Sequence, residues 1–165
     1  MKLFITFLVS LLFAFSEVGN TNSKRSSDNF TVMTSYEKEI RQVLEEEGLE
    51  PYVIELLVAQ SKHESGNYTN SLTKYNNVFA RHYHKTDTFA TSAGAKAEGH
   101  SRFAKYPTIK NATLSQIYYL RRMKYSFEWK STSDFANELK SKHYYEAPIE
   151  VYVSALNRFI KDVDA

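Results

Sequence analysis

The segment from Pro51 to Gly66 constrains the fold of this chain more than any other stretch. Proline is well placed in the first turn of a helix and glycine commonly ends one, so the segment predicts a helix up to about Ser65. Four of its residues share one face at α-helical spacing: Val53, Leu57, Gln60 and Glu64. This largely apolar face ends in a carboxylate, which is the informative exception on a surface that should be buried.

Further helices are predicted on both sides of this segment from helix start and stop signals. Thr34 and Glu37 form a capping-box pattern ahead of apolar residues at helical spacing. Thr113 and Gln116 repeat the pattern and are expected to open another helix. In chain order the additional helices are expected over residues 34–48, 113–125, 133–143 and 148–160.

The helical periodicity disappears between residues 66 and 108. Residues 81–90 alternate weakly, Ser92-Ala93-Gly94 predicts a turn, and residues 100–106 fit a returning strand. We therefore predict an α+β fold that is mostly α-helical, with a small β-hairpin lobe.

The N-terminal region predicts export. Lys2 precedes an apolar run, and Ala14-Phe15-Ser16 offers small residues where signal peptidase cleaves, so residues 1–16 are interpreted as a signal peptide. An uncleaved N-terminal anchor is the alternative, although the run is short for a membrane span. Residues 17–33 are polar and are interpreted as a leader, and residues 34–165 as one folded domain. The expected location is the periplasm, the cell wall or the extracellular space.

Composition excludes several kinds of chemistry. The chain has no cysteine, which excludes disulfides, a thiolate nucleophile and a cysteine-bound metal. Its net charge is +2, without the block of like charges that a nucleic-acid-binding arm would carry. His82 and His84 would share one strand face but lack a third ligand at a recognisable spacing, so neither a metal nor another cofactor is expected. A monomer is expected.

Glu64 is the candidate for acid chemistry. It lies in the last turn of its predicted helix, where partial burial and the negative end of the helix dipole would both raise its pKa. A glycosidase needs a carboxylic acid that is still protonated near neutral pH and can protonate the leaving sugar oxygen. The alternative is a structural glutamate that is paired with Lys62 or Arg81.

The surrounding residues resemble a known enzyme family. Residues 59–71 (AQSKHESGNYTNS) resemble the A-Q-x-x-x-E-S-G-x-x-x-S signature of the bacterial and phage endo-β-N-acetylglucosaminidases, glycoside hydrolase family 73. Three further matches follow in the family's order: residues 76–79 (NNVF) resemble N-N-L-F, residues 103–106 (FAKY) resemble F-x-x-Y, and residues 144–148 (YYEAP) with Tyr152 are similar to G-Y-A-T-D-P-x-Y.

The resemblance covers roughly residues 54 to 160 and implies a lysozyme-like α+β fold, with the hairpin lobe beside an active-site cleft. It implies a peptidoglycan hydrolase that cleaves the β-1,4 bond after N-acetylglucosamine, in wall remodelling or in phage lysis or penetration. Muramidase specificity is also open. The chain departs from the family at two places. Ala80, Arg81 and His82 stand where the family has glycine, an aliphatic residue and lysine, and His143 or Tyr144 replaces the glycine before the terminal tyrosine.

A second carboxylate is expected in the hairpin lobe, and the candidates are Asp87 and Glu98. A separation from Glu64 of roughly 5 Å would fit a nucleophile and retention, while about 6.5–9.5 Å would leave room for water and inversion. Assistance by the substrate's own acetamido group would need no second carboxylate. The alternative for each is an exposed residue on the surface of the hairpin without a catalytic role. Tyr145 joins the catalytic candidates because its family counterpart lines the cleft near the acid.

The residues expected to contact sugar are Tyr68, Asn77, Phe79 and Tyr106. Aromatic faces pack on pyranose rings, and an amide can bond an acetamido group. Phe79 and Tyr106 are alternatively core residues that tie the lobe to the helices. A different functional class also stays open, in which the domain binds the wall or supports a structure without catalysis.

Overall fold

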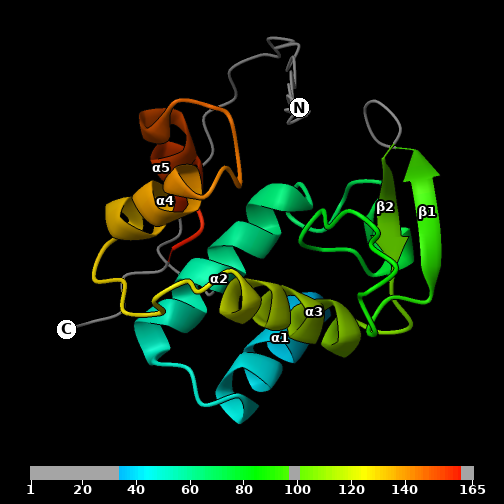
Figure 1. Ribbon diagram of the computed structural model, residues 1–165. Coiled ribbons are helices and arrows are strands. Elements are labelled where there is room, and N and C mark those ends of the chain that lie inside the picture. The colour runs from blue at the N-terminus through cyan, green and yellow to red at the C-terminus, as the bar shows by residue number, and fades with distance from the viewer. Residues whose placement is uncertain (1–33, 97–100, 161–165) are drawn as a thin grey trace, which may run out of the picture.

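The computed structural model describes residues 34–96 and 101–160, and Figure 1 shows its arrangement. The described part of the chain forms α1 (Ser35–Glu46), α2 (Pro51–Glu64), the 3-10 helix η1 (Thr73–Tyr75), β1 (Ser92–Lys96), β2 (Arg102–Lys105), α3 (Ile109–Arg122), α4 (Thr132–Ser141) and α5 (Ile149–Asn157). The predicted α+β, mostly helical fold class is therefore confirmed. The predicted signal peptide (1–16) and leader (17–33) lie outside the described residues. Within the described ranges, no helix is long and apolar enough to cross a membrane.

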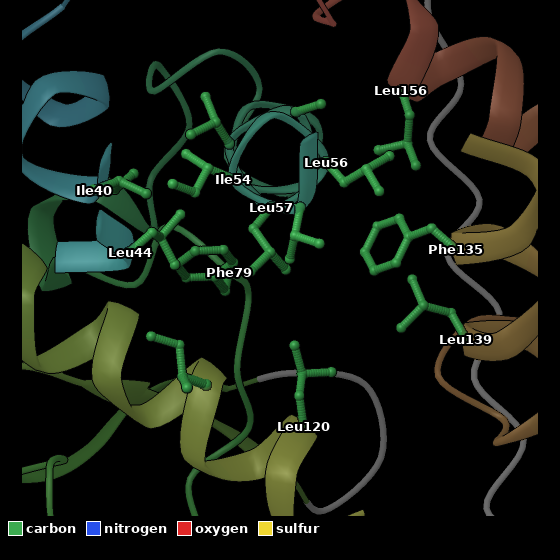
Figure 2. Close-up of a cluster of buried hydrophobic side chains, with 14 of the residues drawn as sticks. Ile40, Leu44, Ile54, Leu56, Leu57, Phe79, Leu120, Phe135, Leu139 and Leu156 are labelled. Atoms are coloured by element: carbon green, nitrogen blue, oxygen red, sulfur yellow. The ribbon is translucent and has the colours of Figure 1, made fainter. Parts of the chain in front are cut away.

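Helix α2 is the centre of the main core. It contacts α1 on one side and α5 on another. Figure 2 shows Ile54 directed toward the α1 side and Leu56 toward α4 and α5. A helix that is apolar on most faces is expected to be buried, and each fully buried leucine contributes about 1.5–3 kcal/mol. The C-terminal end of α2 lies between the α4–α5 pair and the β-hairpin (Figure 1).

Helix α1 begins as the capping-box pattern predicts. The Thr34 side chain accepts a hydrogen bond from the Glu37 backbone nitrogen at 3.2 Å. The carboxylate of Glu37 is buried and pairs with Lys62 Nζ of α2 at 2.6 Å, while Arg41 also contacts it. Arg41 also pairs with Glu55 of α2, so a network of ion pairs links α1 to α2.

The β-hairpin differs from the prediction. The predicted turn at Ser92-Ala93-Gly94 is instead part of β1, which pairs antiparallel with β2. Residues 81–90 form turns and one isolated bridge, between His82 and Phe103. Gly94 is suited to a strand here because a Cβ atom would come within 3.1 Å of the Phe103 carbonyl oxygen. The glycine therefore marks close backbone approach, not a turn.

Two predicted helix starts were displaced. Helix α3 is capped by Thr108, whose hydroxyl accepts from the Asn111 backbone nitrogen at 3.1 Å, and Thr113 lies inside the helix. The Thr113 hydroxyl donates to the Ile109 carbonyl oxygen at 2.9 Å, as an interior threonine can. Helix α4 is capped by Ser131, two residues before the predicted start.

Candidate active site

Glu64 is the last residue of α2 and its side chain is half-buried. The Asn70 amide donates to the Glu64 backbone oxygen at 3.0 Å and so ties the helix end to the following loop. Burial raises the pKa of the Glu64 carboxyl group to about 7, and a hydrogen bond from Tyr152 partly opposes this. A substantial fraction of the group is therefore protonated near neutral pH.

Lys62 and Arg81, the two cations expected as alternative partners of Glu64, contact other residues. Lys62 pairs with Glu37 at 2.6 Å. The Arg81 guanidinium lies 3.7 Å from the ring centroid of Tyr119, as a cation–π contact. Within residues 34–96 and 101–160, no cation forms a salt bridge with Glu64. The raised pKa therefore follows from burial without a compensating charge.

A buried chain of hydrogen bonds ends on the Glu64 carboxylate. Gln116 of α3 donates to Gln60 Oε1 at 3.1 Å, and Gln60 donates to the Tyr152 hydroxyl at 3.4 Å. Tyr152 of α5 in turn donates to Glu64 Oε1 at 3.4 Å. Because Gln60 and Tyr152 each accept from one neighbour and donate to the next, the chain fixes the direction of the Tyr152 hydroxyl. Three helices thus position the carboxylate.

Tyr144 lies on the same network. Its hydroxyl accepts from Gln116 Nε2 at 3.3 Å, and no acceptor for its own proton occurs among the described residues. Burial first, and then the charge of Glu64, raise the pKa of both Tyr144 and Tyr152 well above the usual range. Both phenols therefore stay protonated and can act as hydrogen-bond donors beside the acid.

Tyr145, the tyrosine expected near the acid, has a different environment. Its hydroxyl donates to the Ala136 carbonyl oxygen at 3.0 Å, and its ring stacks on Tyr152 with centroids 4.0 Å apart. His143 has a φ of 57°, the conformation that favours glycine, which supports matching it to the family's glycine before the tyrosine. With this match, Tyr144 corresponds to the tyrosine that follows the glycine in the family motif. The structure places Tyr144 on the Glu64 network and Tyr145 behind Tyr152.

The first candidate for a second carboxylate, Asp87, is held by hydrogen bonds. Its Oδ2 accepts from the Ser115 hydroxyl at 2.6 Å and from the Tyr106 hydroxyl at 3.1 Å, and its Oδ1 accepts from the Phe89 backbone nitrogen at 3.0 Å. Asp87 therefore ties the lobe to α3, and no contact joins it to Glu64. The other candidate, Glu98, lies outside the described residues. A catalytic role for either stays a prediction.

The four residues expected to contact sugar are all buried, with exposed fractions of 8% or less: Tyr68, Asn77, Phe79 and Tyr106. Phe79 packs in the main core with α1 and α2 (Figure 2). The Tyr68 hydroxyl contacts the Ser61 hydroxyl at 2.9 Å. These residues shape the scaffold around Glu64, and direct sugar contact remains a prediction for each.

Asn77 supports the loop that leads from the core into the hairpin lobe. Its amide nitrogen donates to the backbone oxygens of Arg81 at 2.8 Å and Ala104 at 3.0 Å. Its amide oxygen accepts from the Arg81 backbone nitrogen at 2.8 Å. Every polar atom of the side chain is used, so Asn77 fixes the backbone of residue 81 against β2.

His82 and His84, the two histidines considered as metal ligands, lie in different environments. His82 packs edge-on against the Phe103 ring, with centroids 5.2 Å apart, while His84 is exposed. In the described part of the chain, no group of three or more histidine, aspartate or glutamate side chains could hold a metal ion.

Sequence reasoning identified Glu64 and Gln60 on one helix face but missed the roles of Gln116, Tyr144 and Tyr152. A half-buried carboxyl group with a pKa near 7, without a counter-ion and beside two protonated phenols, has the properties of a general acid. A glycoside hydrolase needs an acid of this kind to protonate the leaving sugar oxygen.

Residues 37–165 match the Glucosaminidase family model, described as mannosyl-glycoprotein endo-beta-N-acetylglucosaminidase, and the chain belongs to this family. The family predicted from the four motifs is therefore confirmed. No curated protein and no solved structure matches the chain significantly. Membership makes the chain a glycosidase-family protein with a glycan as its substrate.

Proposed function

We propose that the chain hydrolyses peptidoglycan at the β-1,4 bond after N-acetylglucosamine, with Glu64 as the general acid. The observation that carries the proposal is the burial of the Glu64 carboxyl group without a counter-ion, which raises its pKa to about 7. The motifs around Glu64 support the bond specificity. The signal-peptide pattern supports action outside the cytoplasm, in wall remodelling or in phage lysis or penetration.

In the first step the Glu64 carboxyl proton passes to the glycosidic oxygen while the bond from C1 of N-acetylglucosamine to that oxygen breaks. Proton donation of this kind contributes typically 10²–10⁴-fold to the rate. The hydrogen bond from Tyr152 stabilises the carboxylate that remains. The same carboxylate then serves as a general base for the incoming water.

We propose that the substrate's acetamido oxygen attacks C1 as the leaving group departs. The bonded state of Asp87 supports this route, because its three hydrogen bonds hold it in the lobe scaffold. Water then adds to C1, its proton passes to the Glu64 carboxylate, and the acetamido group is released with overall retention. The Tyr144 hydroxyl, with no acceptor among the described residues, is suited to donate to a substrate oxygen such as that of the acetamido group.

The test is digestion of purified peptidoglycan by the chain and by Glu64→Gln, with mass analysis of the reduced products. Glutamine keeps the size of the side chain and an oxygen that can accept from Tyr152, so the fold should persist. Glu45→Gln is the matched control, because Glu45 is exposed on α1. We expect ends in reduced N-acetylglucosamine with the wild type and the control, and none with Glu64→Gln.

Other results would change the proposal in defined ways. Ends in reduced N-acetylmuramic acid would keep the acid and change the bond to that of a muramidase. Activity retained by Glu64→Gln would remove Glu64 from the mechanism. Binding to insoluble peptidoglycan without any product would favour a non-catalytic wall-binding module.

A further inference from the structure

A small polar hollow lies between the hairpin lobe and α3. Arg81, His84, Asp87, Tyr118, Tyr119 and Arg122 are among the residues that line it. The space is about 20 Å³, which accommodates one polar atom the size of a water molecule and not a sugar ring. The hollow is therefore suited to receive a small polar substituent.

The charges around the hollow favour an anion. Arg81 and Arg122 form no salt bridge within the described residues, whereas the carboxylate oxygens of Asp87 already accept three hydrogen bonds. The Arg81 Nε atom is buried and has no hydrogen-bond partner among the described residues. A buried N–H without a partner costs free energy, and an arginine fork is suited to a carboxylate. The hollow therefore has both positive charge and, within the described chain, an N–H donor without a partner, which are the features that bind an anion.

The position of Arg81 is fixed by the fold. Asn77 binds both the backbone nitrogen and the backbone oxygen of residue 81, and the guanidinium stacks on the Tyr119 ring at 3.7 Å. The family has an aliphatic residue at this position, so the cation is a departure of this chain. A side chain held on both ends loses less conformational entropy when it binds a ligand.

The hollow is linked to the Glu64 site through aromatic residues. The Tyr119 and Tyr144 rings have centroids 6.1 Å apart. The pKa of Tyr144 responds to both charges, because Glu64 raises it and Arg81 lowers it. A substituent beside a sugar bound at Glu64 would therefore lie within reach of Arg81.

We propose that Arg81, with Arg122, binds a carboxylate carried by the muramoyl unit of the glycan and so sets the specificity of this chain for substituted strands. The inference rests on the proposed function. Two carboxylates have this chemistry: the lactyl carboxylate of a muramoyl unit that has lost its peptide, and a carboxylate of an attached stem peptide. Both would accept two parallel N–H bonds from the guanidinium.

The test measures binding by calorimetry in the Glu64→Gln background, so that the ligands are not digested. Three ligands are compared: glycan strands with stem peptides, the same strands after the peptides are removed, and a neutral oligomer of N-acetylglucosamine. We expect Arg81→Leu to weaken binding of a carboxylate-bearing strand about tenfold or more and to change the Kd for the neutral oligomer less than about twofold. Arg81→Lys keeps the charge but loses the two parallel N–H donors of the guanidinium. Its Kd for a carboxylate-bearing strand should lie between those of the parent and Arg81→Leu.

The matched control is Arg121→Leu, because Arg121 pairs with Glu47 at 2.6 Å and does not line the hollow. Thermal melting of each variant confirms that it is folded. Weakening confined to peptide-bearing strands would identify the peptide carboxylate, and weakening confined to stripped strands would identify the lactyl carboxylate. Equal weakening on all three ligands, or none, would overturn the inference and leave the proposed function standing. If the Glu64→Gln protein with Arg81 intact binds none of the three ligands, both the inference and the proposed function would be overturned.

Discussion

The hydroxyl of Tyr152 donates to Oε1 of Glu64 at 3.4 Å, across 88 positions of the chain. Two effects on the acid therefore compete at one contact. Burial disfavours the carboxylate and raises its pKa, while the phenol stabilises the carboxylate and lowers it. Burial is the larger effect, and the net pKa of about 7 leaves the group able both to give up and to recover a proton near neutral pH.

Tyr152→Phe should raise the pKa of Glu64, because the substitution removes the donor and leaves the burial. The alkaline limb of the kcat/KM profile should then move to higher pH, since the acid stays protonated longer. Gln60 would also lose its acceptor, which should destabilise the fold by about 1–3 kcal/mol. Tyr145→Phe is the control, and its limb should not move. An unchanged limb in Tyr152→Phe would show that the long contact does not influence the acid.

Glu64→Gln should change how stability depends on pH. The pKa of Glu64 is raised in the folded state, so the folded chain holds its proton more tightly than the unfolded chain. Its contribution to stability is full below about 4.5 and is lost as the pH rises through about 7. At about 1.36 kcal/mol per pKa unit, the upper limit is about 3 kcal/mol.

Urea denaturation of wild type and Glu64→Gln at several pH values checks this prediction. The stability of the wild type relative to the variant should decrease between pH 4.5 and about 7.5 and then level off. Other titrating groups are common to both proteins and cancel in the difference. A difference that increases with pH would show that folding favours the charged carboxylate.

Tyr144→Phe should reduce kcat by about tenfold or more, because it removes a hydroxyl whose proton has no acceptor among the described residues. It also removes the acceptor of Gln116 Nε2 at 3.3 Å, which should destabilise the chain by about 1 kcal/mol. Tyr145→Phe loses the hydrogen bond to Ala136 and should destabilise the chain by a similar amount, about 1 kcal/mol, without a comparable loss of kcat. Turnover and denaturation of the two variants measure this. A larger kcat loss in Tyr145→Phe would restore Tyr145 as the catalytic tyrosine.

Asp87→Asn separates the structural role of this residue from a catalytic one. Replacing the carboxylate should weaken its bonds from Ser115 and Tyr106 and destabilise the chain by about 1–2 kcal/mol. If the acetamido group assists the reaction, kcat should stay within about threefold. A loss of more than about 10²-fold at unchanged stability would make Asp87 the second carboxylate. Melting temperature and turnover on peptidoglycan decide between the two.

The parts of the site that could be predicted from the sequence depend on local signals. The stripe that carries Gln60 and Glu64 follows from helical periodicity, and the stop at Gly66 places Glu64 at the helix end. The direction of its pKa shift follows from that position. The Thr34 cap is equally local, because it involves a hydrogen bond across three residues.

The rest depends on contacts that no local pattern encodes. Gln116 reaches Gln60 across 56 positions, and its spacing from Thr113 also matches a capping box, so the pattern predicted a helix start inside α3. Periodicity cannot decide which of two adjacent tyrosines faces the acid. The hydrogen bonds decide it, because the Tyr144 hydroxyl accepts from Gln116 while the Tyr145 hydroxyl donates to the Ala136 carbonyl oxygen.

Backbone conformation gives the last prediction, at Ala80. This residue has a φ of 49°, in the left-handed region, and the family has glycine there. A Cβ in this conformation costs roughly 1–2 kcal/mol, while glycine adds conformational entropy to the unfolded chain. Ala80→Gly should therefore stabilise the chain by a net of about 0.5–1 kcal/mol.

Chemical denaturation measures the effect, with Ala95→Gly in β1 as the opposite control, because Ala95 has no positive φ and should lose stability. Destabilisation by Ala80→Gly would show that the methyl group contributes packing that exceeds the strain. Since Asn77 already fixes the backbone of residue 81 through two hydrogen bonds, relief of strain at residue 80 should leave Arg81 in place. Binding of carboxylate-bearing strands should then be unchanged while stability rises, which distinguishes the backbone of this loop from the side chain that it presents.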